Sequence, residues 1–141
     1  MIEMPWKIIA LQTIRGTTAK PGELAVAELV KIAPGFFAHD AAPRVYWITN
    51  TGTGWSLRGG HVHPDGGKRE IIVALAGAIE FDLHAAMSCG KIVLDDPGHG
   101  LLIPNGVWHG VRISPGGILL SIASTLYASD ESVTAKPCRC P

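Results

Sequence analysis

The stretch RGGHVHPDGGKREIIVAL, residues 58–75, carries the strongest indication of the fold. His61 and His63 are separated by one residue, and on a β-strand such side chains point to the same face. A turn-forming segment, residues 64–67, separates the histidines from an apolar run typical of a buried strand. We therefore expect two strands joined by a turn, with both imidazoles directed at one interior point.

A third histidine, His109, lies just after the turn signal Pro104-Asn105-Gly106, where another strand is expected to begin. Three imidazoles facing one cavity are difficult to explain as packing, because burying polar groups without partners costs free energy. The pattern indicates either a metal site or a site that handles protons.

Short apolar segments recur along the chain between glycine- and proline-containing turns. This spacing predicts an all-β, single-domain barrel or jelly roll. By helix propensity alone, residues 22–32 are predicted to be helical. The predicted strands cover residues 6–14, 45–49, 56–63, 70–75, 78–83, 91–94, 101–103, 109–113 and 118–124.

Length and charge limit the possible functions. The 141 residues fit one domain, predicted over 1–130, followed by a polar tail over 131–141. Twelve basic and twelve acidic residues cancel, so nucleic acid is not an expected partner. No apolar run reaches transmembrane length, and we expect a cytoplasmic protein without a membrane partner. An odd number of cysteines, three, argues for free thiols in the tail rather than a disulfide framework.

The histidine segments resemble the two sequence motifs of the cupin superfamily, which implies a cupin β-barrel. The first motif has two histidines, a glutamate and a glycine, and its matches are His61, His63, Glu70 and Gly77. The second motif has two glycines, a proline and a histidine, and its matches are Gly98, Gly106, Pro104 and His109. Six residues separate His63 from Glu70, more than is usual in cupins.

Within the cupins, the chain is similar to the WxcM-like sugar-nucleotide 3,4-ketoisomerases over roughly residues 15–130. This resemblance implies an isomerase that moves the ketone of a nucleotide-linked 4-keto-6-deoxy sugar, of the dTDP-4-keto-6-deoxyglucose type, from C4 to C3. It also implies a cofactor-free homodimer with exchanged N-terminal strands, and a strand rather than a helix over 22–29. The matching segments are Arg15-Gly16, Arg44-Val45-Tyr46, Arg58 to His63, Trp108-His109 and Ala123-Ser124.

The resemblance also implies roles for individual residues. His63 is expected to remove the C3 proton with His61 as its partner, and Tyr46 to relay or donate a proton. Arg58 and Arg15 are expected to bind the pyrophosphate, because guanidinium groups make paired bonds to phosphate oxygens. The remaining expected substrate contacts are Trp108 and His109.

Two other interpretations stay open. The family usually has glutamine where this chain has Glu70, and glutamate restores the four-ligand set of a metal cupin, His61, His63, Glu70 and His109. Such a site would suit Zn, Fe, Mn, Ni or Cu, and would serve a dioxygenase, a decarboxylase or a metal-assisted isomerase. The other alternative is a sugar-binding cupin without catalytic activity.

Overall fold

The computed structural model describes residues 4–10, 12–13, 27–28, 44–63 and 69–124. The predicted turn at 64–67 and the tail at 131–141 lie outside these residues, as does Arg15. In the part of the chain that is described, no helix is long and apolar enough to cross a membrane.

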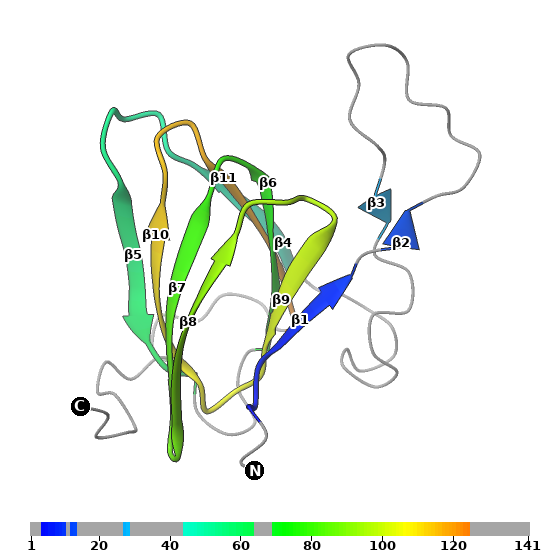
Figure 1. The fold of residues 1–141 in the computed structure, drawn as a ribbon, viewed down its shortest axis with the longest axis vertical. Coiled ribbons are helices and arrows are strands. Elements are labelled where there is room, and N and C mark those ends of the chain that lie inside the picture. The colour runs from blue at the N-terminus through cyan, green and yellow to red at the C-terminus, as the bar shows by residue number, and fades with distance from the viewer. Residues whose placement is uncertain (1–3, 11, 14–26, 29–43, 64–68, 125–141) are drawn as a thin grey trace.

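Two antiparallel sheets face each other, as Figure 1 shows. The five-stranded sheet has the order β1 (Lys7–Ala10), β9 (His99–Ile103), β6 (Glu70–Ala76), β11 (Ile118–Ala123) and β4 (Arg44–Thr49). The four-stranded sheet has the order β5 (Ser56–His61), β10 (Trp108–Ile113), β7 (Ile79–Ala85) and β8 (Ser88–Leu94). A separate pair joins β2 (Gln12–Thr13) to β3 (Ala27–Glu28).

The main core fills the space between the two sheets. Ile72 of β6 and Leu119 of β11 belong to one buried cluster with Phe81 of β7 and Val111 of β10. Their neighbours in sequence point outward, because side chains alternate along a strand. The arrangement confirms the predicted all-β jelly roll, and it leaves one end of the interior to polar side chains.

The structure corrects the helix predicted over residues 22–32. Its described members, Ala27 and Glu28, form β3 and pair with β2, as the family resemblance implied. Helix propensity is a weak preference, and pairing with another strand overrides it here. The predicted strand over residues 6–14 is also divided, into β1 and β2.

The expectation that the cysteines do not form a disulfide is wrong. Cys89, on β8, is disulfide-bonded. The other cysteines are Cys138 and Cys140, both outside the described residues. An odd number of cysteines argues against a framework in which every cysteine is paired, but it is compatible with one disulfide and one free thiol.

Candidate active site

An irregularity in β5 sets the direction of the first histidine. Gly59 pairs with Gly110 and His61 pairs with His109, so Gly60 is an extra residue in β5. Gly59 and Gly60 have φ of 73° and 79°, which side chains rarely tolerate. A Cβ at Gly59 would lie 2.8 Å from the carbonyl oxygen of His109. The Gly-Gly pair therefore forms a β-bulge that turns His61 toward the interior.

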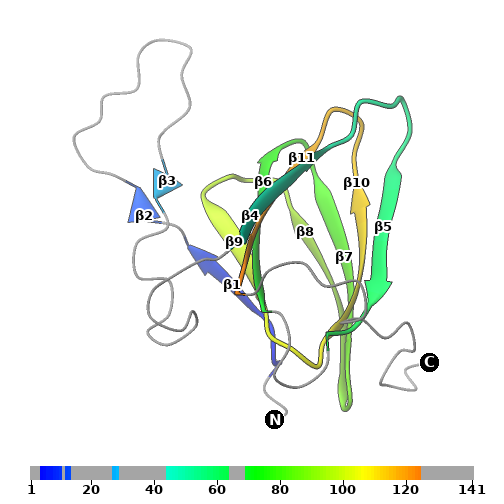
Figure 2. The ribbon, with the colours of Figure 1, turned by 180° about the vertical axis from the view of Figure 1, so that it is seen from behind.

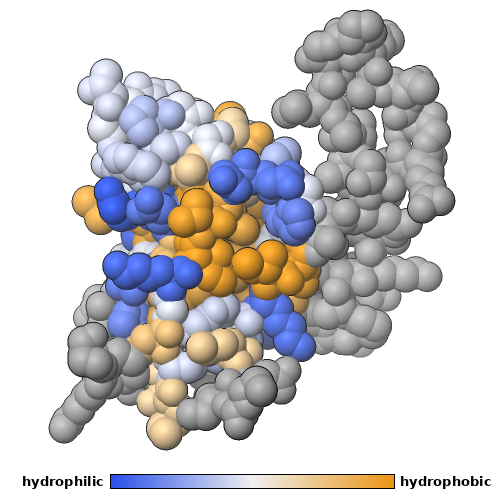
Figure 3. All heavy atoms as spheres, in the orientation of Figure 1, coloured by the Kyte–Doolittle hydropathy of each residue, from blue (hydrophilic) through white to orange (hydrophobic). Residues whose placement is uncertain are grey.

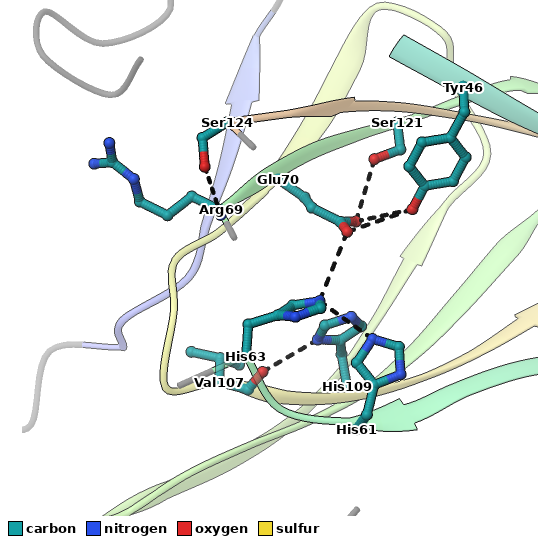
Figure 4. Close-up of polar contacts among 9 residues, drawn as sticks. All are labelled: Tyr46, His61, His63, Arg69, Glu70, Val107, His109, Ser121 and Ser124. Carbon is teal, nitrogen blue, oxygen red and sulfur yellow. Dashed lines mark hydrogen bonds and ion pairs between the residues drawn. The ribbon is translucent and has the colours of Figure 1, made fainter. Parts of the chain in front are cut away.

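The three histidines predicted from the sequence gather at this point, as Figure 4 shows. The Nε2 atoms of His61 and His63 are 3.2 Å apart. The ring of His61 lies 4.8 Å from the rings of both His63 and His109, measured between centroids. His63 and His109 are buried, and His61 is partly buried. The predicted convergence on one interior spot is confirmed.

Backbone contacts fix the orientation of His109. Its Nδ1 lies 3.1 Å from the carbonyl oxygen of Val107. A carbonyl oxygen only accepts hydrogen bonds, so Nδ1 carries the proton and neutral His109 keeps Nε2 as its acceptor. The 3.2 Å contact between His61 and His63 likewise requires one ring to donate to the other. The cluster is thus arranged to hold and pass protons.

A buried carboxylate lies across from the histidines, on the five-stranded sheet. Glu70 is 2% exposed and accepts hydrogen bonds from Tyr46 Oη at 3.3 Å and from Ser121 Oγ at 3.2 Å. Its Oε1 is 3.9 Å from Nε2 of His63. Figure 4 shows Glu70 between the two hydroxyl groups and the imidazoles. Tyr46, Glu70, His63 and His61 thus lie in a row, in which the 3.9 Å step from Glu70 to His63 is an ion-pair contact rather than a hydrogen bond.

Ser121 was not predicted from the sequence. It is fully buried and faces the interior from β11, where Leu119 also belongs to the core. Ser121 could have been found from the sequence, because it lies two residues after Leu119 on a predicted strand. Residues with this spacing share one face, which places the hydroxyl toward the core.

Arg58 shares the interior face of β5 with His61. It pairs with Val111, a core residue two positions from His109, and paired residues on neighbouring strands lie on the same face. The side chain is exposed, so it lies at the open side of the barrel. This position suits contact with a substrate that enters toward the histidines.

Trp108 is not brought to the histidine cluster. Alternation along β10 places it on the face opposite His109. Its ring lies 5.3 Å from that of His84 and over Gly110, on the outside of the four-stranded sheet. Trp108 therefore lies away from the histidine cluster, and its predicted contact with the substrate stays a prediction.

The four-ligand metal set is only partly assembled. His61, His63 and His109 place one nitrogen each within 4.8 Å of one another. Glu70 instead contacts Tyr46 and Ser121, and it is not a member of that group. Three imidazoles are chemically suited to Zn, Fe, Ni or Cu, so the donor set fits a metal without Glu70.

Comparison with known proteins agrees with this geometry. The model of the family "FdtA: WxcM-like, C-terminal" matches residues 4–135. A 3,4-ketoisomerase from Helicobacter canadensis is 27% identical, with a TM-score of 0.74 over 94% of this chain and 92% of that one. No curated protein matches the chain.

Two further solved structures show the same similarity. The sugar 3,4-ketoisomerase QdtA from Thermoanaerobacterium thermosaccharolyticum, in complex with TDP, is 26% identical, with a TM-score of 0.74 over 95% of this chain and 90% of its own. The TDP-quinovose 3,4-ketoisomerase WlaRB from Campylobacter jejuni is 28% identical, with a TM-score of 0.73 over 92% of each chain. The family match spans nearly the whole chain and includes every described residue of the histidine site. The chain therefore belongs to the WxcM-like, C-terminal family.

Proposed function

We propose that this protein is a nucleotide-sugar 3,4-ketoisomerase, which moves the ketone of a nucleotide-linked 4-keto-6-deoxy sugar from C4 to C3. The observation that carries the proposal is the pair of Nε2 atoms of His61 and His63, 3.2 Å apart and facing one interior space. Two adjacent carbons must lose and gain protons in this reaction, and two adjacent imidazoles match that demand. One of the similar structures is described as a complex with TDP-4-keto-6-deoxyglucose, which supports this substrate class.

The reaction needs no oxidant or reductant. His63 removes the proton from C3, the C3–C4 double bond forms, and the C4 oxygen takes up a proton to give an enediol. A proton is then delivered to C4 while the C3 hydroxyl loses its own proton, which leaves the ketone at C3. His61 exchanges a proton with His63 across their 3.2 Å contact, and Glu70, held by Tyr46 and 3.9 Å from His63, stabilises that ring while it holds a proton.

Arg58 is the proposed contact for the pyrophosphate of the substrate. Arg58 is exposed, and by its strand register it shares the face of β5 that carries His61. A charged pyrophosphate would therefore stay near solvent while the sugar reaches the histidines. Bidentate hydrogen bonding from arginine to phosphate oxygens supports this role.

The proposal is tested with dTDP-4-keto-6-deoxyglucose in D2O. An isomerase of this mechanism yields a 3-keto product with deuterium at C4, and by the reverse reaction it places deuterium at C3 of the remaining substrate; proton NMR follows both product formation and exchange. His63→Asn should abolish both signals, while His99→Asn, at an exposed histidine that contacts Asp96, should leave them unchanged. Tight binding of the sugar nucleotide without exchange or product would instead show a sugar-binding cupin.

A metal-dependent cupin enzyme is the second candidate, because His61, His63 and His109 converge on one point. When bound, a divalent metal would polarise the oxygens of a substrate at the cluster. The purified protein is therefore to be assayed for Zn, Fe, Mn, Ni and Cu by plasma mass spectrometry. About one metal per chain, lost in His61→Ala, would favour this candidate. No metal in active enzyme would favour acid–base chemistry by the histidines alone.

We also propose a homodimer formed through the outer face of the five-stranded sheet, seen in Figure 2. Ile71, Val73 and Leu102 form a second apolar cluster on this face and are already buried within the chain, so the surface open to a partner is the apolar area beside them. Val45 and Trp47 continue it along β4, the last strand of the sheet, and are 52% and 69% exposed. A large exposed tryptophan on a continuous apolar face is typical of a protein interface. A second copy of the chain would cover this surface.

A further inference from the structure

The disulfide of Cys89 lies at an edge of the four-stranded sheet. Cys89 is on β8, the last strand of this sheet, and its side chain is partly exposed. The other cysteines of the chain are Cys138 and Cys140, so the bridge joins this edge to the C-terminal tail. One disulfide uses two of the three cysteines and leaves one tail cysteine as a thiol. A partly exposed bridge on an edge strand is open to attack by a small thiol.

A histidine lies beside Cys89 on the outer face of the sheet. His84 of β7 pairs with Cys89 in the strand register, and paired side chains share a face, with Cβ atoms about 4.5–5.5 Å apart. This face is the outer one, because the preceding residue, Leu83, belongs to the core. Figure 3 shows the outer face, on which hydrophilic groups lie around a hydrophobic centre.

The imidazole of His84 is held in place by two contacts. Its Nε2 lies 2.9 Å from Oδ1 of Asp82, and its ring lies 5.3 Å from that of Trp108, edge to face. A carboxylate only accepts hydrogen bonds, so Nε2 carries a proton. A second proton on the ring gives an imidazolium that is paired with Asp82. The side chain is 9% exposed, so this cation would stay beside Cys89.

The charges around Cys89 favour a thiolate on its sulfur. Among the described residues of this sheet, its ionisable neighbours on the outer face are His84 and Asp82 on β7 and Lys91, two residues along β8. Two of these groups carry positive charge when His84 is protonated, and one carries negative charge. Positive charge beside a sulfur stabilises its thiolate, and a stabilised thiolate leaves more readily when a disulfide is attacked.

We propose that Cys89 is a site of reversible thiol–disulfide exchange with small thiols such as glutathione. The thiolate of the small molecule attacks the sulfur of the tail cysteine, the S–S bond to Cys89 breaks, and its electron pair goes to the sulfur of Cys89. That sulfur then takes up the proton that the attacking thiol lost. A second small thiol attacks the mixed disulfide on the tail, so two small thiols are oxidised to their disulfide while the protein gains two thiols. The tail is thereby released from β8.

The test is reduction of the full-length protein, prepared without reductant, by millimolar glutathione near neutral pH. Iodoacetamide traps free thiols at timed intervals, and mass spectrometry of the digest gives the alkylated fraction of Cys89 and the position of bound glutathione. We expect Cys89 to become alkylated in the folded protein, with glutathione on the C-terminal peptide. Glutathione disulfide should then restore the bridge. The result does not depend on the proposed isomerase activity.

A matched pair of variants tests the role of His84. His84→Gln keeps a polar side chain without the positive charge, and it should slow the release of Cys89 at least about fivefold. His99→Gln should react normally, because His99 also contacts an aspartate, Asp96, at 3.0 Å but lies on β9 of the other sheet. In urea, where the fold is lost, both variants and the wild type should react at one rate. A substitution that only loosened the fold would instead make the bridge react faster.

Lys91→Glu is a second variant at an exposed position, in case His84→Gln does not fold. It reverses a charge beside Cys89 and should slow the release at least about threefold. The proposal is overturned if glutathione opens the bridge only in urea, or if it is found mainly on Cys89. It is also overturned if folded His84→Gln, or Lys91→Glu in its place, reacts as fast as the wild type or faster.

Discussion

Arg58 and His61 are three residues apart in the sequence, yet both lie on the interior face of β5. In a regular strand, residues with this spacing point to opposite faces. The extra residue Gly60 changes the register between the pairs Arg58–Val111 and His61–His109. The arginine proposed to bind the pyrophosphate and an imidazole of the cluster thereby lie on one face of the strand.

Gly59→Ala should therefore damage both stability and activity. A Cβ at this position would meet the His109 carbonyl oxygen at 2.8 Å and would also require a positive φ. We expect a loss of about 2–4 kcal/mol in the free energy of unfolding, measured by urea titration. Isomerase activity should fall at least tenfold because His61 and His109 shift together.

Gly116→Ala is the matched control for Gly59→Ala. Gly116 also has a positive φ, of 71°, but a Cβ there meets nothing within 4 Å. It should cost only about 1–2 kcal/mol and leave the kinetic constants unchanged. Equal effects of the two substitutions would show that the contact with His109 is unimportant.

The histidine cluster could be predicted from sequence because its signals are local. The spacing of His61 and His63 fixes a common face, and the turn before His109 fixes where its strand begins. The same alternation places Trp108 and His109 on opposite faces of β10, although they are neighbours in the sequence. Resemblance to a family implied which residues contact the substrate, whereas the direction of each side chain follows from its position along the strand.

Other features depend on contacts between distant segments and could not be deduced locally. The hydrogen bonds of Glu70 to Tyr46 and Ser121 span 24 and 51 residues of sequence. The strand at Ala27–Glu28 depends on its pairing with β2. Neither the hydrogen bonds nor the strand pairing leaves a mark in the composition of its own segment. The sequence alone therefore could not choose between Glu70 as a metal ligand and Glu70 as a hydrogen-bond partner.

His63→Asn should preserve the fold and reduce kcat by at least about 10³-fold, because the proposed base is removed while a polar side chain is kept. The β-sheet signal in circular dichroism and the Tm should change little. Steady-state assays with dTDP-4-keto-6-deoxyglucose measure the effect. Retention of more than a tenth of the wild-type kcat would refute His63 as the C3 base.

Trp47→Glu should dissociate the proposed homodimer, because it places a charge on the apolar outer face of the five-stranded sheet. Light scattering after size-exclusion chromatography should give about twice the mass of the 14.9 kDa chain for the wild type and the monomer mass for the variant. Leu57→Glu is the control, since Leu57 is 78% exposed on the other sheet. A monomeric wild type, or dissociation by both substitutions, would contradict the assignment of this face.

After proteolytic digestion without reductant, the peptide that contains Cys89 should remain joined by a disulfide to the C-terminal peptide, which contains the other two cysteines. Cys89→Ser should remove the link and lower the free energy of unfolding by about 2–4 kcal/mol, as expected for closing a loop of this size. Mass spectrometry of the digest gives the first result and urea titration the second. Three free thiols per chain in protein prepared without reductant would count against the bridge.

Glu70→Gln separates acid–base chemistry from metal chemistry at the site. The amide keeps the shape of the side chain and still accepts hydrogen bonds from Tyr46 and Ser121 through its oxygen. It removes the negative charge that lies 3.9 Å from His63 and stabilises that ring when it holds a proton. If the histidines act as acid and base, we expect kcat to fall about 10- to 100-fold with little change in KM.

Tyr46→Phe is the partner experiment, because it removes the 3.3 Å hydrogen bond to Glu70 but keeps the charge. We expect a smaller loss of kcat than in Glu70→Gln, and no further loss when the two substitutions are combined, since both act through the carboxylate beside His63. If Glu70 were instead a metal ligand, Glu70→Gln would lower metal content and Tyr46→Phe would not. Plasma mass spectrometry of both variants, set beside their kcat values, therefore decides which chemistry the carboxylate serves.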